Sequence, residues 1–295
     1  MILRIITGII GIVIAAVVIQ FGGVPFAIFA ALLSLIAWHE YSAAFYKAGV
    51  STAYIFGALN LILILCCAYL GNIEEIFAVL TLGMLAILLL TVLWSLNPTE
   101  AGVSIAGVFY IGLPFAHLIL LRFLTEERDP MEAVKVLADD VNNLMAGGVE
   151  QLGQLFSNID LGCALIWILF TCTWASDTFA YFVGSAIGSH KLAPSISPNK
   201  TVEGFLGSIF GTTLIAVVVG HFLFGFPLIY MAAAGCLLAI VATLGDLVES
   251  AIKRFTGIKD SGFIIPGHGG VLDRFDSIFF TAPVFYYYVL ATGLI

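Results

Sequence analysis

Long apolar stretches dominate the chain. Nine of them have about the 20 residues that an α-helix needs to cross the hydrocarbon core of a bilayer. They run over residues 2–21, 24–46, 51–70, 76–96, 101–122, 160–187, 203–224, 228–250 and 276–294. The breaks between them carry glycine, proline or charged residues, as at Gly22-Gly23 and Asn97-Pro98. This pattern predicts an all-α, polytopic integral membrane protein with about nine transmembrane helices.

The composition agrees with the pattern and excludes other classes. Of the 295 residues, 61% are hydrophobic and 10% are charged, whereas soluble domains average about 45–50% and about 25%. A water-soluble monomer has too little polar surface to cover such an excess. The net charge of -8 gives no general attraction to polyanions, so we expect no nucleic acid partner. The lipid bilayer is the expected environment.

Two segments interrupt the apolar pattern. Residues 123–159 are polar, with apolar positions at helical spacing, which predicts an amphipathic helix on the membrane surface. Residues 251–275 carry charged residues and glycines and are interpreted as a loop. The predicted organisation is therefore an N-terminal membrane region of five spans (1–122), the surface segment (123–159) and a C-terminal catalytic membrane region of four spans (160–295).

The basic residues predict the orientation. With nine spans, eight of them fall on the side of the amino terminus: Arg4, Lys47, Lys191, Lys200, Lys253, Arg254, Lys259 and Arg274. The other side has only three, all within the acidic segment 122–135. Because short cytoplasmic loops are enriched in Lys and Arg, we expect a cytoplasmic amino terminus and a surface segment on the non-cytoplasmic side.

Two spans contain ionisable side chains. Asp177 lies well inside the sixth apolar run, where a carboxylate is costly and normally faces a polar cavity or a partner. We favour a functional carboxylate over a purely structural contact. In the second run, Trp38-His39-Glu40-Tyr41 is interpreted as an interfacial aromatic belt with a locally paired Glu40.

The loop that precedes the seventh run carries lysines and hydroxyl groups. These are Lys191, Ser197, Lys200 and Thr201. A helix amino terminus presents free N–H groups and favours anions, so the segment suits a phosphate contact. The alternative is an ordinary cytoplasmic loop with basic residues.

The end of the eighth run places acids on one helix face. Asp246 is followed by Glu249 or Ser250 and then by Lys253, at intervals of three or four residues. Two carboxylates one turn apart offer the oxygen ligands that magnesium prefers. The alternative is a simple i, i+4 ion pair between Glu249 and Lys253.

Residues 259–277 carry the densest chemistry of the chain. Glycines 267, 269 and 270 allow a ligand to approach the backbone closely, and Asp273 and Asp276 follow one turn apart. Basic side chains surround these acids in the sequence: Lys253, Arg254, Lys259 and Arg274. Metal-binding carboxylates, basic groups and a glycine turn together predict a nucleotide or pyrophosphate site.

These residues resemble the signature of the phosphatidate cytidylyltransferase (CDP-diacylglycerol synthase) family. The signature is Ser-x-x-Lys-Arg, then Lys-Asp, Pro-x-His-Gly-Gly and Asp-Arg-x-Asp. It is matched here by Ser250, Lys253, Arg254, Lys259, Asp260, Pro266, His268, Gly269, Gly270, Asp273, Arg274 and Asp276. The segment 197–204 resembles the family element Ser-Pro-x-Lys-Thr-x-Glu-Gly. The resemblance covers residues 174–277; many members carry a basic residue and a Trp where this chain has Asn199 and Val202.

The resemblance implies an activity and a set of site residues. CTP and phosphatidate give CDP-diacylglycerol and pyrophosphate with Mg²⁺, and a second cation, monovalent or divalent, is left open. The catalytic candidates are Asp246, Lys253, Lys259, Asp273 and Arg274. Substrate-binding candidates are Lys191, Ser197, Lys200, Thr201, Ser250, Arg254, His268, Gly269 and Gly270, with His268 preferred as a phosphate or ribose contact. Metal-ligand candidates are Asp177, Asp246, Glu249, Asp273 and Asp276.

The same resemblance implies a multi-pass protein of the inner (cytoplasmic) membrane, with its active site facing the cytoplasm, and a homodimer. Three other functions compete with this one. A cation-coupled transporter would spread its acids through the membrane depth. A CDP-alcohol phosphatidyltransferase would carry Asp-Gly-x-x-Ala-Arg followed by Gly-x-x-x-Asp-x-x-x-Asp, which this chain lacks. A pure scaffold leaves the motif at 250–276 unexplained.

Overall fold

A computed structural model describes residues 2–94, 96–124, 159–262, 264 and 269–294. The predicted surface helix over 123–159 therefore lies almost wholly outside the described residues.

The amino-terminal half consists of five helices in chain order. They are α1 (Ile2–Phe21), α2 (Gly23–Lys47), α3 (Tyr54–Tyr69), α4 (Ile73–Leu93) and α5 (Pro98–Arg122). Local sequence explains where the last two begin. The Asn72 side chain accepts from the Glu75 N–H, and Asn97 and Glu100 form a capping box ahead of α5.

The carboxy-terminal half adds further helices and one small hairpin. Its elements are α7 (Leu161–Ile187), β1 (Lys191–Ala193), β2 (Ser197–Thr201), α8 (Val202–Ala216), the π-helix η1 (Val217–Leu223), α9 (Leu228–Thr256), α10 (Val271–Phe275) and α11 (Ile278–Thr292). β1 and β2 pair antiparallel, with Lys191 opposite Thr201. The segment 188–202, between the sixth and seventh runs, was predicted only as a loop.

Each of the nine predicted apolar runs contains a helix, and the all-α membrane class is confirmed. In the described part of the chain, six helices are long and apolar enough to cross a membrane: α2, α4, α5, α7, α8 continued by η1, and α9. α3 and α11 have 16 and 15 residues, less than a full span requires. The count of nine spans and the orientation of the termini therefore stay predictions.

The interpretation of 251–275 as a loop was partly wrong. α9 continues for 29 residues to Thr256, so Lys253 and Arg254 are helical, and the helix ends where Gly257 takes a left-handed conformation at φ +69°. The short helix α10 then begins at Val271. This places Lys253 on the same helix as Asp246 and Glu249, which fixes its direction relative to them.

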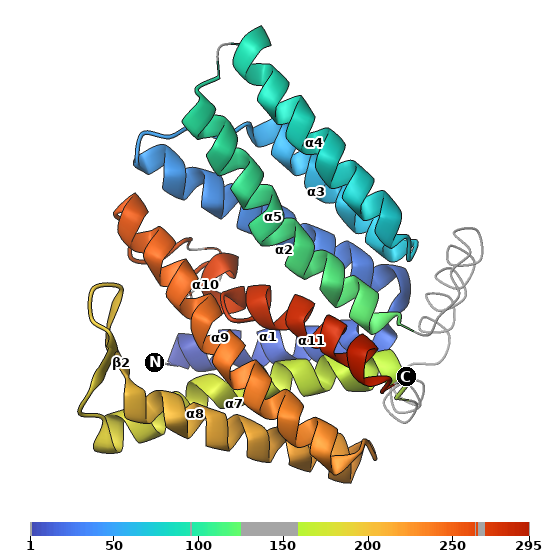
Figure 1. The fold of residues 1–295 in the computed structure, drawn as a ribbon, viewed down its shortest axis with the longest axis vertical. Helices are drawn as coiled ribbons and strands as arrows, with labels where there is room; N and C mark the ends of the chain where they lie inside the picture. Colours follow the sequence, from blue (N-terminus) through green and yellow to red (C-terminus); the bar gives the residue numbers. More distant parts are fainter. Residues whose placement is uncertain (1, 95, 125–158, 263, 265–268, 295) are drawn as a thin grey trace.

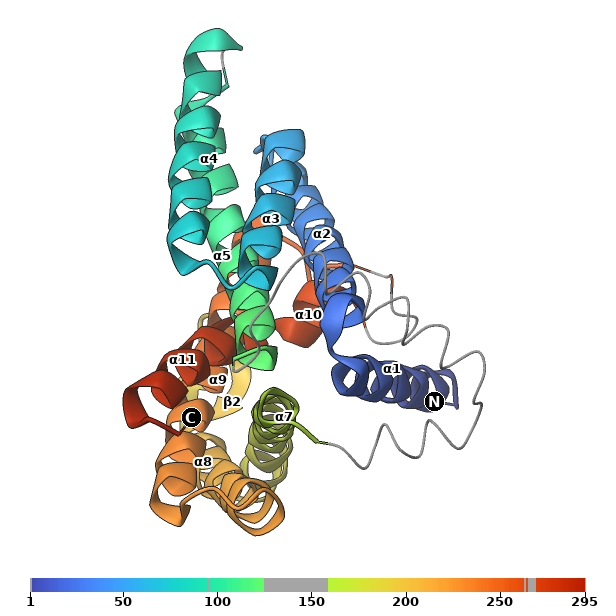
Figure 2. The ribbon, with the colours of Figure 1, turned by 90° about the vertical axis from the view of Figure 1, so that its right-hand side faces the viewer.

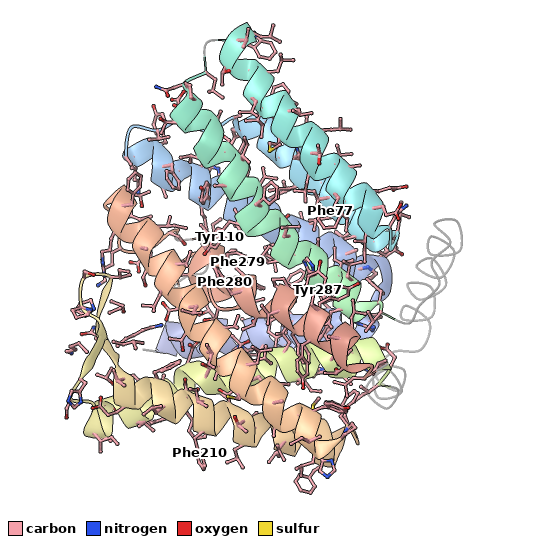
Figure 3. All side chains as sticks on the ribbon, viewed as in Figure 1. Phe77, Tyr110, Phe210, Phe279, Phe280 and Tyr287 are labelled. Carbon is pink, nitrogen blue, oxygen red and sulfur yellow. The ribbon has the colours of Figure 1, made fainter. Side chains whose placement is uncertain are left out.

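Two groups of helices meet along α9 and α11. α5 packs against α2, α3, α4 and α11, while α7 packs against α8 and α9. Figure 1 shows α3, α4 and α5 at one end of the molecule and α7 and α8 at the other, with α9 and α11 between them. Figure 2 shows α1 extending to one side. Tyr110 and Phe279 lie in contact where α5 meets α11, with ring centroids 5.0 Å apart (Figure 3).

Candidate functional site

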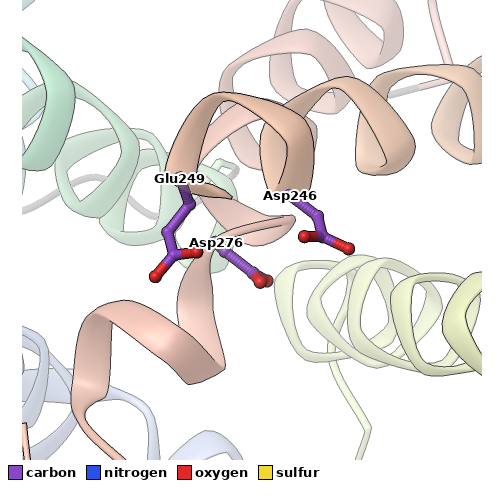
Figure 4. A group of neighbouring side chains, drawn as sticks. All are labelled: Asp246, Glu249 and Asp276. Carbon is purple, nitrogen blue, oxygen red and sulfur yellow. The ribbon is translucent and has the colours of Figure 1, made fainter. Parts of the chain in front are cut away.

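Three carboxylates converge where α9 crosses the junction between α10 and α11. Asp246 and Glu249 lie one turn apart on α9, and Asp276 lies between α10 and α11. One oxygen from each side chain lies within 4.8 Å of the others (Figure 4). The close approach depends on Gly245, because a Cβ at this position would lie 2.7 Å from the Asp276 carbonyl oxygen.

This carboxylate cluster suits a hard cation. Glu249 is only 2% exposed, and among the described residues its charged partner is Lys253, with Nζ 2.7 Å from Oε2. The i, i+4 ion pair considered as an alternative is therefore present, and it lies inside the larger cluster. Three carboxylates this close repel one another unless positive charge lies between them. Their oxygen donors are of the type that Mg²⁺ binds.

Asp273 lies outside this cluster and holds the backbone of its own segment. Oδ1 accepts from Lys253 Nζ at 2.9 Å, and Oδ2 accepts from the N–H groups of Ser261 and Gly270 and from the Ser261 hydroxyl. Burial opposes ionisation of Asp273, but the hydrogen bonds from Gly270, Lys253 and Ser261 outweigh it and lower its pKa to about 2. Asp273 is thus an ionised carboxylate whose oxygens are already engaged.

A cavity of about 470 Å³ opens beside the carboxylate cluster. Its wall includes Asp177 and Gly184 from α7, Lys200 and Thr201 from β2, and Asp246 from α9. Lys200 forms an ion pair with Asp246. Asp177 therefore lines this cavity together with a member of the cluster.

The β hairpin brings other predicted substrate-binding residues near α9. Arg254 Nε donates to the Ile196 carbonyl at 3.2 Å, which ties the tip of the hairpin to the end of α9. Ser197 begins β2, whereas Lys191 on β1 is exposed. The Thr201 hydroxyl accepts from the Gly204 N–H at 3.1 Å, so it caps α8. On α9 itself, the Ser250 hydroxyl donates to Asp246 Oδ1 at 3.3 Å.

The motif segment is only partly described. Lys259 and Arg274 are exposed, and His268 lies outside the described residues. Gly269 has φ +85°, a conformation that favours glycine. The backbone N–H of Gly270, predicted to approach a ligand, donates to Asp273 in the structure. No contact in the described residues tests whether these side chains bind substrate.

Glu40 was misread from the sequence. Its carboxylate is 2% exposed and accepts from the N–H groups of Val271 and Leu272 at 3.0 and 2.9 Å. Its partners thus lie on α10 instead of its own neighbourhood. Trp38 is fully buried and donates to the Tyr54 carbonyl, so it is not an interfacial belt residue. The missed signal was the one used for Asp177, a carboxylate inside an apolar run.

Comparison with known proteins identifies the family. Residues 2–292 match the model of the cytidylyltransferase family. The chain is 34% identical over 289 residues to a phosphatidate cytidylyltransferase of Synechocystis, covering 97% of this chain and 96% of the relative. It is 33% identical over 286 residues to the enzyme of that name from Staphylococcus haemolyticus, covering 95% and 96%. With that of Bacillus subtilis it shares 48% identity over 130 residues, 43% of this chain and 48% of the relative. The resemblance seen in residues 174–277 is therefore confirmed over nearly the full length, and the chain belongs to the cytidylyltransferase family.

Proposed function

We propose that this protein transfers the cytidylyl group of CTP to phosphatidate, giving CDP-diacylglycerol and pyrophosphate. The observation that carries the proposal is the carboxylate cluster of Asp246, Glu249 and Asp276 beside a cavity that Asp177 and Lys200 also line, in a chain whose relatives carry the name phosphatidate cytidylyltransferase. A membrane protein suits this reaction because one substrate is a lipid and the other is a soluble nucleotide.

The reaction joins two anions. A phosphate oxygen of phosphatidate attacks the α-phosphorus of CTP, and the bond from that phosphorus to the bridging oxygen of the β-phosphate breaks. Pyrophosphate leaves with the bonding electrons. A phosphate monoester is largely ionised at neutral pH, so the protein need not supply a strong base. Its main tasks are to bring the two anions together and to stabilise the charge that develops on the leaving group.

Positive groups around the cluster are placed for these tasks. Lys200 lines the cavity and lies against Asp246, and Lys253 lies against Glu249 and Asp273. We assign Lys200 to substrate phosphate and Lys253 to the charge balance of the cluster. Arg254, Lys259 and Arg274 lie in exposed positions around the end of α9 and on α10, and we assign them to the triphosphate.

Asp246, Glu249 and Asp276 would hold the divalent cation, which we propose to be Mg²⁺. Bound there, the cation screens the repulsion between the two phosphate groups. Asp177, which lines the same cavity, is proposed as a further ligand of the cation or as a polar residue of the cavity wall. Asp273 is retained as a catalytic-site residue that acts through Lys253 and the backbone it binds.

The cellular setting is also part of the proposal. We place the protein in the cytoplasmic membrane with the site facing the cytosol, where CTP is available, and we propose a homodimer. The transporter alternative has no support in the family to which the chain belongs. In a variant that lacks the five native cysteines, labelling of single cysteines introduced beside Lys47 and beside Lys191 tests the orientation. Chemical cross-linking in native membranes tests the dimer.

The direct test uses the purified protein in detergent micelles with CTP, phosphatidate and Mg²⁺. We expect pyrophosphate and CDP-diacylglycerol in equal amounts, and no pyrophosphate when phosphatidate or Mg²⁺ is left out. Asp246→Asn should lower kcat by about 100-fold or more, the scale of losing one electrostatic group in a site. Glu74→Gln, on the exposed first turn of α4, is the matched control and should behave like the parent.

Pyrophosphate release that does not require phosphatidate would contradict the assigned reaction. Equal turnover by the parent and Asp246→Asn would contradict the assigned site and leave the reaction intact.

A further inference from the structure

The carboxylate of Glu40 connects the amino-terminal half of the molecule to the catalytic motif. Glu40 lies on α2, and its two oxygens accept from the N–H groups of Val271 and Leu272, the first two residues of α10. The Ser261 hydroxyl also lies 3.4 Å from Glu40, but it is closer to Asp273, at 2.8 Å, and donates there. The two backbone N–H groups are therefore the main partners of a carboxylate that is buried from solvent.

The fit between Glu40 and the motif is close. A Cβ added at Gly270 would lie 2.5 Å from both Glu40 oxygens, and one added at Gly262 would lie 2.2 Å from Oε1. Both positions therefore require glycine for the carboxylate to reach the backbone. The sequence explained Gly270 by the approach of a ligand, whereas here the group that approaches it is a side chain of the same protein.

α10 depends on such external contacts. It has five residues, too few for a helix that is stable by itself. The N–H groups of its first two residues, Val271 and Leu272, are bound by Glu40, and that of the preceding N-cap, Gly270, is bound by Asp273. Asp276 follows α10 directly, so a shift of α10 moves Asp276 relative to Asp246 and Glu249.

We infer that Glu40 is a positioning residue of the transfer reaction: through the backbone of Val271 and Leu272 it fixes α10, and thereby Asp276, against the carboxylates of α9. This inference rests on the proposed function of the carboxylate cluster. It gives α2, which lies more than 200 residues earlier in the sequence than α10, a part in the site.

Glu40→Gln is the most informative variant, because it keeps the size of the side chain. Its amide offers one carbonyl acceptor, so one of the two N–H groups would face an NH₂ donor instead. Glu40→Ala removes both acceptors. The matched control is Glu100→Gln, since Glu100 also accepts from two backbone N–H groups, those of Asn97 and Ser51, at the start of α5.

For each purified variant we would measure kcat, the KM values for CTP and phosphatidate, the Mg²⁺ concentration for half-maximal rate and the midpoint of thermal unfolding. Glu40→Gln should lower kcat by about 10- to 100-fold, the range expected from a displacement of up to 1 Å at a reacting site. Its half-saturating Mg²⁺ should rise, while KM for CTP at saturating Mg²⁺ stays close to that of Glu100→Gln. Its unfolding midpoint should lie below that of Glu100→Gln, because a buried N–H group loses its acceptor, so kcat is compared per folded molecule. Glu40→Ala should lose more activity per folded molecule than Glu40→Gln.

Two results would overturn the inference. One is a kcat of Glu40→Gln equal to that of Glu100→Gln. The other is a loss of activity in Glu40→Ala that disappears when its rate is divided by the fraction of folded protein. If the parent forms no CDP-diacylglycerol, the proposed function fails first, and hydrogen exchange then decides the role of Glu40. Faster exchange of peptides covering 269–277 in Glu40→Gln supports it, and unchanged exchange overturns it.

Discussion

Replacing Gly245 by alanine tests whether the approach of α9 to the α10–α11 junction sets the site. The new Cβ would lie 2.7 Å from the Asp276 carbonyl oxygen, 3.1 Å from the Ser277 Cα and 3.3 Å from the Phe280 Cβ. Ordinary contact begins at 3.4 Å. The first of these atoms belongs to backbone, so no side chain can rotate away to relieve the overlap. The two segments must therefore separate by about 0.7 Å.

A displacement of this size should reduce catalysis more than folding. We expect kcat of Gly245→Ala to fall by about 10- to 100-fold, with a loss of stability of about 1–3 kcal/mol from overpacking. Both are measured on the purified protein, by production of CDP-diacylglycerol and by unfolding in detergent micelles.

The control is Gly102→Ala on α5, where an added Cβ meets no atom within 4 Å. It should keep the parent kcat, and its stability should be equal or higher by up to about 1 kcal/mol because alanine favours a helix. If Gly245→Ala turns over as fast as Gly102→Ala, the close approach of α9 to Asp276 is not required, and the geometric reading of the cluster is refuted.

The remaining predictions concern charge and capping. Lys253→Met leaves Glu249 and Asp273 without the cation that they share and should lower the free energy of unfolding by about 3–5 kcal/mol. Lys47→Met, at an exposed position, is the control and should leave the stability nearly unchanged. Equal unfolding midpoints of the two variants would contradict the prediction. The folded pKa of Asp273, about 2 against an ordinary 3.8, gives stability that is present above about pH 4 and lost as pH falls through 2. The unfolding midpoint of the parent should therefore approach that of Asp273→Asn as pH is lowered from about 5 to 2; a constant difference over that range would contradict it. Thr201→Val removes the N-cap of α8 and should lower the free energy of unfolding by about 1 kcal/mol, while Thr201→Ser keeps the hydroxyl and the parent stability. A loss of activity in Thr201→Ser at unchanged stability would indicate that the Thr201 methyl group contacts substrate.

The helices were predictable because their cause is local. An apolar run of about 20 residues has few alternatives to a buried or membrane-spanning helix, and each predicted run contains one. The pairing of Asp246 with Glu249 was predictable for the same reason, since helical spacing alone places them on one face. The boundaries were less accurate: α9 runs six residues beyond the predicted end, to a glycine cap that hydrophobicity does not record.

The partners of the site were not predictable because they depend on packing between distant segments. Asp273 and Asp276 are separated by a single turn and look equivalent in the sequence. In the structure, Asp276 joins the α9 carboxylates, whereas Asp273 points to Lys253 and Ser261. Glu40 lies in the second apolar run, and nothing in its local sequence indicates that its acceptors meet the backbone of α10.

The arrangement of charge supports the divalent cation that we propose for the site. Among the described residues the carboxylates of Asp177, Asp246, Glu249 and Asp276 lie on one cavity or in one cluster, and the lysines in direct contact with them are Lys200 and Lys253. Lys253 is shared with Asp273, so its single charge cannot balance both partners. These carboxylates outnumber the two lysines that touch them, and the other basic groups of the motif, Arg254, Lys259 and Arg274, lie in exposed positions. The cluster itself therefore repels the phosphate groups of CTP and phosphatidate, which are anions. A divalent cation bound to the cluster reverses the sign of that interaction. The cation should therefore be required for substrate binding and for the chemical step alike. CTP binding measured without phosphatidate should weaken when Mg²⁺ is removed.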